Sequence, residues 1–283
     1  MQVELAKEKF IDVVNSIHVS LIAQTASLAP ADKQLYALRN VTATVESIPL
    51  IAASIMSKKL AAGSDGIVLD VKTGRGAFMQ NYGDALELAR TMVDIGEGAG
   101  RRVVALITGM DQPLGYAIGN AVEVSEAIDT LNGTGPADLN ELVLVLGGEM
   151  LVLAGIANSH RDATQMLENN LATGKAACKF QDLIKAQGGN PDVVENPDLL
   201  PRAKQQLELK SSQKGSVQEI NALEAGMAAK ILGAGRETKE QGIDLSIGIV
   251  LKKKVGDIVD KGETLAVLHT DGDAAKIKPA TER

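Results

Sequence analysis

A hydroxyl group and an ammonium group lie one helical turn apart in the first third of the chain. Ser54 and Lys58 are four residues apart in a stretch with helical periodicity, so their side chains share one face. Ile51 and Ile55 lie on that face and should point inward. Because buried polar groups need partners, a polar ligand would satisfy both side chains. The alternative, which composition alone favours, is that Lys58 reaches water and Ser54 bonds its own backbone.

A glycine loop at residues 72–76 follows a predicted buried strand. Backbone N–H groups in such loops can approach a ligand closely. The loop has neither the dinucleotide-binding fingerprint nor the ending of a phosphate-binding P-loop. A plain tight turn therefore explains it equally well.

Two glycines and two glutamates mark a third region. Gly115 and Gly119 allow several carbonyl oxygens to turn towards one point, and Glu123 or Glu126 on the next predicted helix would add a carboxylate. Such an oxygen cage suits a hard cation. From spacing alone, two solvated glutamates are the simpler interpretation.

The remaining residues predict neither a catalytic triad nor a transition-metal site. His18, His160 and His269 have no metal-ligand spacing, and no paired catalytic carboxylates can be argued. The single cysteine, Cys178, is predicted to lie on a buried helix face rather than to act as a reactive thiol. One cysteine cannot form an internal disulfide, which fits a reducing cytoplasm.

The composition indicates a globular protein with an aliphatic core. Of the 283 residues, 45% are hydrophobic and only 2% are aromatic. The net charge of -7 argues against a general nucleic-acid binder, which needs a surplus of Lys and Arg, although a local basic pocket for a small anion stays open. The N-terminus lacks the pattern of a signal peptide, and no apolar run approaches the roughly 18 residues of a membrane span. Neither nucleic acid nor a membrane is expected as a partner.

Alternating strands and helices predict an α/β fold with a mainly parallel sheet flanked by helices. The strand at 66–71 is a nearly continuous apolar run, which is typical of burial on both faces. The other elements expected in the first half are helices at 7–17, 30–39, 47–62, 84–95 and near Glu123, and strands at 19–23 and 103–107.

The second half is predicted to be helical at first and β-rich at its end. Composition changes after the proline-containing connector at 190–201, and turn residues then become frequent. The expected order is helices between 137 and 187 that break near Ser159 and at Gly174, the connector, strands at 243–251 and 263–270, and a polar, frayed end at 271–283.

Five long motifs follow one another at residues 28–45, 47–59, 70–79, 112–124 and 233–236, before a Gly256-Asp257 turn. Together they closely resemble the pyrimidine-nucleoside and thymidine phosphorylase family over nearly the whole chain. The resemblance implies reversible phosphorolysis, in which phosphate attacks the anomeric carbon of uridine or thymidine and releases free base and pentose 1-phosphate. Cationic donors at the base would stabilise the negative charge that develops as it leaves.

The resemblance assigns roles that spacing leaves open. Arg39, Ser54 and Lys58 match the positions that hold the pyrimidine ring, and Tyr36 resembles a further residue of that pocket. Arg39 would offer a planar fork of donors and Lys58 a point charge. No residue of this chain is assigned a catalytic role.

A cation is also implied by the resemblance, and no organic cofactor. The backbone carbonyls of Leu114 and Ala117 and the carboxylate of Glu126 match the ligands of a monovalent or calcium-like ion, K+ or Ca2+. Ligands beyond these would come from elsewhere, so this site is expected to be open.

One expected segment is absent from the sequence. The family's phosphate-binding loop, of Lys-His-Ser-Thr-Gly-Gly type, occurs nowhere in the 283 residues, so the phosphate-binding residues are unknown. We expect Met1 to be a truncation point or a misassigned start. Smaller departures are Asn40 for the usual Asp, Arg75 for a small residue, and Ala23 for Gly beside Gln24 and Thr25.

Family organisation implies four regions. Residues 1–29 would begin an α/β domain whose first strands are missing, 30–63 would form part of a small helical domain, 64–201 the α/β domain and 202–283 a C-terminal α+β region. The family is homodimeric, but its dimerising helical domain is incomplete here. A cytoplasmic location is expected.

Four interpretations compete. The leading one is a pyrimidine-nucleoside phosphorylase acting in nucleoside metabolism and salvage, and the second is an inactive fragment that binds base weakly. A related phosphoribosyltransferase would lack the set Arg39, Ser54 and Lys58. A carrier domain of the lipoyl type would need a modifiable Lys at a hairpin tip, and the C-terminal turn lacks that motif.

Overall fold

The computed structural model describes residues 1–23, 29–42, 44–236 and 242–283 of the chain, without the side chains of Lys33, Ala37, Asn40 and Val41. The side chain of Asn40, and Gln24 and Thr25 beside the departure at Ala23, therefore lie outside the description. The chain forms two compact units, each built from separate stretches of sequence. Each unit is described by itself.

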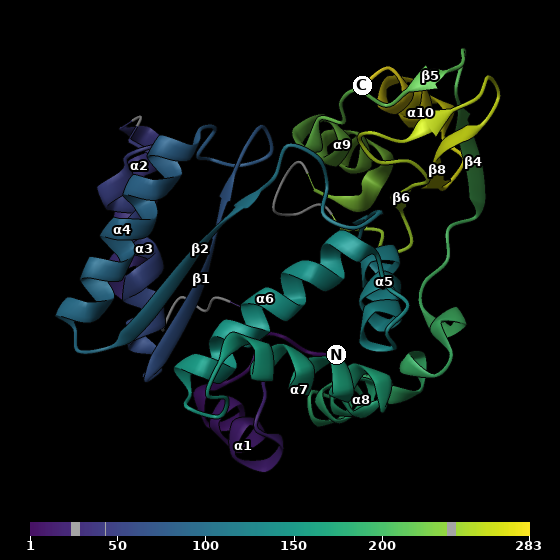
Figure 1. Ribbon diagram of the computed structural model, residues 1–283. Coiled ribbons are helices and arrows are strands. Elements are labelled where there is room, and N and C mark those ends of the chain that lie inside the picture. Colours follow the sequence, from purple (N-terminus) through teal and green to yellow (C-terminus); the bar gives the residue numbers. More distant parts are fainter. Residues whose placement is uncertain (24–28, 43, 237–241) are drawn as a thin grey trace. The chain divides into compact units, whose positions relative to one another are not determined.

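The first unit comprises Met1–Thr73, Phe78–Thr108 and Leu142–Pro191. It holds most of the helices and a parallel pair of strands, β1 and β2, which lie side by side in Figure 1. Its elements are α1 (Lys7–Ile17), α2 (Pro30–Val41), α3 (Ile48–Ala61), β1 (Gly66–Thr73), α4 (Tyr82–Gly98), β2 (Arg102–Gly109), most of α6 (Ala137–Leu153), α7 (His160–Ala172) and α8 (Lys175–Ala186).

The core of this unit lies on one face of β1. Alternate residues Ile67, Leu69 and Val71 are buried, whereas Asp70 between them is exposed. The helices α3 and α4 lie on one side of the strands (Figure 1) and supply buried Ala52, Met56, Ala85, Leu88 and Met92. The prediction of full burial on both faces is confirmed for one face only, because on the opposite face Val68 is half-buried and Asp70 is exposed.

Close packing of α4 against β2 depends on Gly96. A Cβ at this position would collide with Cγ2 of Val103 and lie 3.1 Å from Cε of Met56. Gly98, two residues later on the same helix, has open space where its Cβ would lie. The packing therefore requires glycine at position 96 but not at position 98.

Helix ends in this unit follow the predicted signals at several points. The bounds of α1 are those predicted, and Ser159 caps α7 by accepting a hydrogen bond from the N–H of Asp162 at 3.1 Å. Gly174, with φ of 71°, separates α7 from α8. The prediction for Cys178 is wrong, since its side chain lies on the exposed side of α8.

The strand predicted at 19–23 does not form. Gln187, only 2% exposed, binds this segment with its carboxamide: Oε1 accepts from the N–H of Leu21 at 2.9 Å, and Nε2 donates to the carbonyl of Leu21 at 2.8 Å. Nε2 also donates to the carbonyl of Gln2 at 2.6 Å. A side chain thus takes the backbone groups that a neighbouring strand would otherwise bind.

The second unit comprises Gly74–Ala77, Gly109–Glu141 and Asp192–Arg283. Its main sheet has the order β3-β6-β8-β4, with antiparallel pairing throughout. Its elements are β3 (Ala117–Gly119), α5 (Ala121–Leu131), two 3-10 turns (Pro191–Val194 and Pro197–Leu199), β4 (Gln205–Lys210), β5 (Gly215–Ser216), α9 (Ala222–Ala229), a π-helical turn (Lys230–Ala234), β6 (Gly248–Leu251), β7 (Ile258–Val259), β8 (Thr264–Thr270) and α10 (Ala274–Thr281).

The C-terminal part of this unit has its own core. Leu232, Ile247, Ile249 and Leu268 are buried together with residues of α9 and α10. The prediction of a frayed end is wrong: Asp273 caps α10 by accepting from the N–H of Ala275 at 2.9 Å, and Ala280 belongs to the core.

The α/β class and the β-rich C-terminal region are confirmed. Within the described stretches, no helix combines the length and apolar character needed to cross a bilayer.

Candidate functional site

Ser54 and Lys58 share one face of α3, as their spacing predicts, and they are in contact. Lys58 Nζ donates to Ser54 Oγ at 2.8 Å. The same ammonium forms an ion pair with Asp32 on α2, with 2.8 Å between Nζ and Oδ2. The alternative in which Lys58 simply reaches water is therefore wrong.

Asp32 is a member of this cluster that the sequence reasoning missed. Its carboxylate is only 8% exposed. Burial by itself would raise the pKa of Asp32, but hydrogen bonds from Lys58 and Ser54 and the charges of Lys58 and Arg39 outweigh it and hold the pKa below its ordinary value. Asp32 is therefore ionised, and its carboxylate fixes the position of the Lys58 side chain.

Arg39 is anchored beside the cluster by backbone carbonyls. Its guanidinium donates to the carbonyls of Thr44 and Leu50, each at 3.3 Å, and to that of Val45. The residue is 6% exposed, and its Cζ lies 5.5 Å from the centre of the ring of Tyr36, which is 47% exposed. Its charge acts on Asp32, so all four predicted base-site residues belong to one neighbourhood of α2 and α3.

The glycine loop is bound by the protein itself. The N–H of Arg75 donates to Oδ1 of Asp111 at 3.1 Å, and the Arg75 side chain pairs with Glu219. Gly74 has φ of 118°, and a Cβ there would lie 2.7 Å from the same Asp111 oxygen. The loop is a tight turn closed by a carboxylate, as the plainer interpretation holds.

Glu126, the predicted cation ligand, is half-buried against the loop that precedes it. Its Oε1 accepts from the N–H of Tyr116 at 2.8 Å and from that of Ala117 at 3.0 Å. A side chain at Gly115, where φ is 64°, would collide with Oε2. Burial raises the pKa of Glu126 and the charge of Asp138 adds to this rise, while the two N–H groups oppose it.

The interpretation of two solvated glutamates holds for Glu123, which is exposed, but not for Glu126, which is half-buried. Glu126 is held as described above, and Glu123 Oε1 accepts from the N–H of Gly119 at 2.8 Å. Both carboxylates therefore fix backbone amides at the start of α5. Only Glu126 remains as the candidate ligand that the resemblance names.

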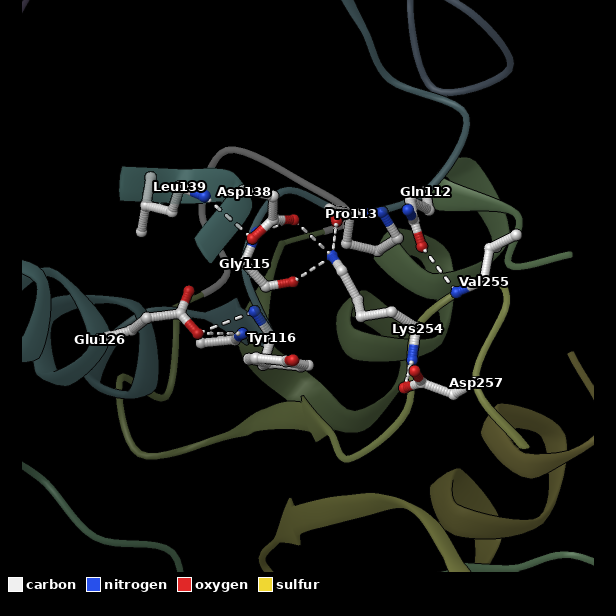
Figure 2. A network of polar contacts seen from close by, with 11 residues as sticks. Gln112, Pro113, Gly115, Tyr116, Glu126, Asp138, Leu139, Lys254, Val255 and Asp257 are labelled. Atoms are coloured by element: carbon white, nitrogen blue, oxygen red, sulfur yellow. Dashed lines mark hydrogen bonds and ion pairs between the residues drawn. The ribbon is translucent and has the colours of Figure 1, made fainter. Parts of the chain in front are cut away.

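Lys254 and Asp138 complete this network, and the sequence gives no local signal for either. Figure 2 shows the Lys254 ammonium facing the loop, with Nζ 2.5 Å from the carbonyl of Pro113 and 2.6 Å from that of Gly115. It also lies 2.9 Å from Oδ2 of Asp138. Burial alone would raise the pKa of Asp138, but the hydrogen bond and charge of Lys254 lower it.

Tyr116 and Ala117 both direct their N–H groups to Glu126. The carbonyl of Tyr116 accepts from the N–H of Leu251 on β6 at 2.8 Å. The carbonyls of Leu114 and Ala117 are the other ligands that the resemblance implies. Carbonyl and carboxylate oxygens suit K+ or Ca2+ better than a transition metal.

A cavity of about 620 Å³ adjoins this site. Its walls include Ala117, Glu126, Asp129, Lys252 and His269. Burial and the charge of Lys252 lower the pKa of His269, so its imidazole is neutral near neutral pH. There is room beside Glu126 for an ion with coordinated water.

The three histidines have different surroundings. His160 contacts Glu149 at 2.7 Å, His18 ends α1 with φ of 61°, and His269 lines the cavity. In the part of the chain that the structure describes, no three His, Cys, Asp or Glu residues are grouped to hold a metal.

Comparison with known proteins gives two family matches. Residues 1–177 match the glycosyl transferase family, a/b domain, and residues 216–281 match the pyrimidine nucleoside phosphorylase C-terminal domain.

Relatives named pyrimidine-nucleoside phosphorylase include proteins of Bacillus subtilis, which is 57% identical, and of Staphylococcus haemolyticus and Geobacillus stearothermophilus, each 56% identical. Each match covers 95% of this chain and 62% of the relative. The chain thus spans under two thirds of the length of these relatives.

Proposed function

Because the chain belongs to the glycosyl transferase family defined by this α/β domain, we propose that it is the base-recognising part of a pyrimidine-nucleoside phosphorylase. The observation that carries the proposal is the ammonium of Lys58, fixed between Asp32 and Ser54 beside the guanidinium of Arg39. Two cations and a hydroxyl in one neighbourhood suit a ligand with carbonyl oxygens and an imide.

These groups would act on the leaving base. When phosphate displaces the pyrimidine from the anomeric carbon, negative charge develops on the ring. Lys58 and Arg39 are held in place before the reaction, so they would stabilise that charge without reorganising. Ser54 Oγ can donate or accept at the imide. Tyr36, packed beside Arg39, would form one wall of the pocket.

Phosphate must be held by residues other than Tyr36, Arg39, Ser54 and Lys58. The Lys-His-Ser-Thr-Gly-Gly-type loop is not in the printed sequence, and the chain spans 62% of its relatives. Positioning of a nucleophile can supply roughly 7–11 kcal/mol of a barrier. We therefore propose that the chain by itself binds pyrimidine but turns over little nucleoside, and that the complete protein performs phosphorolysis.

The test is a chimera in which the part of the Bacillus subtilis relative that this chain does not span is joined to it. With phosphate, the chimera should release free base from uridine or thymidine, and Arg39→Ala should abolish release. A folded chimera without activity would contradict the proposal. Robust turnover by the chain alone would instead show that its own residues hold phosphate.

Three further properties belong to this proposal. The Leu114 and Ala117 carbonyls with Glu126 would hold a K+ or Ca2+ ion, and the position of the Glu126 carboxylate against the N–H groups of Tyr116 and Ala117 supports this proposal. The complete protein would be a homodimer, and its location would be cytoplasmic. Sedimentation of the chimera measures the second property directly.

A further inference from the structure

Two cavities of the second unit adjoin each other where α5 meets the sheet. The larger, of about 620 Å³, is the one described above, and the smaller has a volume of about 280 Å³. Val122, Ser125 and His269 line both of them. The smaller cavity contains none of the predicted cation ligands, so it is distinct from the proposed cation site.

The start of α5 lies unusually close to the sheet beside these cavities. Gly119 on β3 and Gly248 on β6 are paired in register. A Cβ at Gly119 would lie 3.1 Å from Cγ2 of Val122, and a Cβ at Gly248 would lie 2.7 Å from the same atom. Val122 therefore packs on two residues that have no side chain, and this contact holds α5 in place between the cavities' shared walls.

The imidazole of His269 is a half-buried polar group without a protein partner. On β8, His269 pairs in register with Gly248 on one side and with Gln206 of β4 on the other. Burial and the charge of Lys252 lower its pKa, so the ring is neutral near neutral pH. Among the described residues, neither ring nitrogen has a hydrogen-bond partner. A neutral imidazole offers one N–H donor and one acceptor to whatever enters the cavities.

Ser125 presents a second unused donor and acceptor. Its side chain lies on α5 and lines the same two cavities as His269. Within the described stretches of the chain, the hydroxyl of Ser125 makes no hydrogen bond. Because half-buried polar groups gain free energy when they are paired, the two side chains suit a ligand whose N–H and C=O groups are adjacent.

The walls of the smaller cavity are otherwise largely apolar. The connector before β4 contributes Pro197, Leu200, Pro201 and Ala203, and α5 contributes Ala121. Ligand sites in proteins commonly combine apolar walls with a few convergent polar groups. A flat heterocyclic ring fits this combination, with its faces against the apolar walls and its edge towards the polar groups.

The larger cavity offers groups that suit hydroxyls. Asp129 and Lys252 line it, and in the described residues neither side chain has an ion-pair partner. A hydroxyl can donate to the carboxylate and accept from the ammonium.

The charges around the two cavities favour a neutral ligand. The charged side chains that line either cavity are Glu126, Asp129, Asp198, Arg202 and Lys252. Acids thus exceed bases by one, so an anionic ligand would meet a net negative wall.

We propose that the junction of the two cavities binds a neutral nucleoside. Its base would lie in the smaller cavity with its edge at Ser125 and His269, and its sugar hydroxyls would lie near Asp129 and Lys252. This site uses none of the residues of the proposed base site on α2 and α3. The chain would therefore bind two nucleoside molecules, one at each site.

The first experiment observes His269 directly. The chain has three histidines, so each imidazole signal in an NMR spectrum can be assigned by substitution. Titration of the 283-residue chain with uridine should shift the signal of His269 and leave that of His160 unchanged, since His160 pairs with Glu149 on α6. By calorimetry, the original chain should bind two uridine molecules and Lys58→Met should retain one.

Substitutions in the Lys58→Met background isolate the second site. Ser125→Ala should weaken uridine binding there by about 3- to 10-fold, and His269→Leu, which removes a donor and an acceptor, by about 10-fold or more. His269→Gln keeps both kinds of group and should retain part of the affinity. His160→Leu is the matched control and should bind uridine like its parent. Uracil, which lacks the sugar, and uridine 5'-phosphate, which is anionic, should both bind more weakly than uridine.

Two results would overturn the inference. One is a His269 signal that saturating uridine leaves unchanged. The other is uridine binding in Lys58→Met that neither Ser125→Ala nor His269→Leu weakens. Tighter binding of uridine 5'-phosphate than of uridine would refute the neutral ligand class. The outcome is separate from that of the proposed function: a shifted His269 signal with no effect of Lys58→Met would contradict the base site alone.

Discussion

The carboxylate of Asp32 and the ammonium of Lys58 form an ion pair with 2.8 Å between Oδ2 and Nζ, and the pair joins α2 to α3. Ser54 Oγ accepts from the same ammonium at 2.8 Å. The three side chains provide hydrogen-bond partners for one another. This explains how a largely apolar helix face accommodates a lysine. One of the two cations of the proposed base site, Lys58, is thus positioned by an acid.

Asp32→Asn should lower the free energy of unfolding by about 1–3 kcal/mol, because the substitution removes the charge of a buried carboxylate that pairs with a partly buried ammonium. Since the pKa of Asp32 is lowered in the folded chain, its contribution is complete above the unfolded value of about 3.9 and is lost as pH falls through the folded value. The difference between the two proteins in urea unfolding should therefore be constant near neutral pH and shrink below about pH 4. Asp65→Asn, at an exposed carboxylate, is the control.

Gln187→Leu should destabilise the first unit by about 2–4 kcal/mol. The carboxamide of Gln187 binds both backbone groups of Leu21 and the carbonyl of Gln2, and a leucine at this buried position would remove all of these hydrogen bonds. Urea unfolding measures the change. The exposed Gln206 offers a control, since Gln206→Leu should change stability by less than about 0.5 kcal/mol. Equal effects would contradict the structural role of Gln187.

Gly96→Ala should cost about 1–3 kcal/mol, because the added methyl group collides with Val103 in the packing of α4 on β2. Gly98→Ala on the same helix meets open space and should be neutral or stabilise by up to about 1 kcal/mol. Thermal unfolding of the two variants separates steric cost from helix propensity. Val103→Ala added to Gly96→Ala should recover part of the loss, and no recovery would argue against this contact.

Local patterns in the sequence predict much of the secondary structure. The bounds of α1, the N-cap at Ser159 and the break at Gly174 all depend on residues within one or two turns of one another. The shared face of Ser54 and Lys58 follows from helical spacing in the same way.

Long-range partners explain what the sequence could not predict. Lys254 contacts Gly115 across 139 positions of the chain, and Asp32 meets Lys58 across 26. The segment at 19–23 has the composition of a strand, but the carboxamide of Gln187, 166 positions from Leu21, binds its backbone instead. Helix α10 has a polar sequence, and only the core contact of Ala280 shows why it is ordered.

The most direct test of the central claim is the affinity of the chain for a free pyrimidine, measured by calorimetry with uracil and thymine. Lys58→Met should weaken binding by about 10-fold or more, since a hydrogen bond to a charged group contributes roughly 1.5–3 kcal/mol. Lys59→Met changes the neighbouring lysine of α3, about 100° around the helix, and should bind like the original chain. Equal affinities of the original chain and Lys58→Met, with both proteins folded, would contradict base recognition at this site.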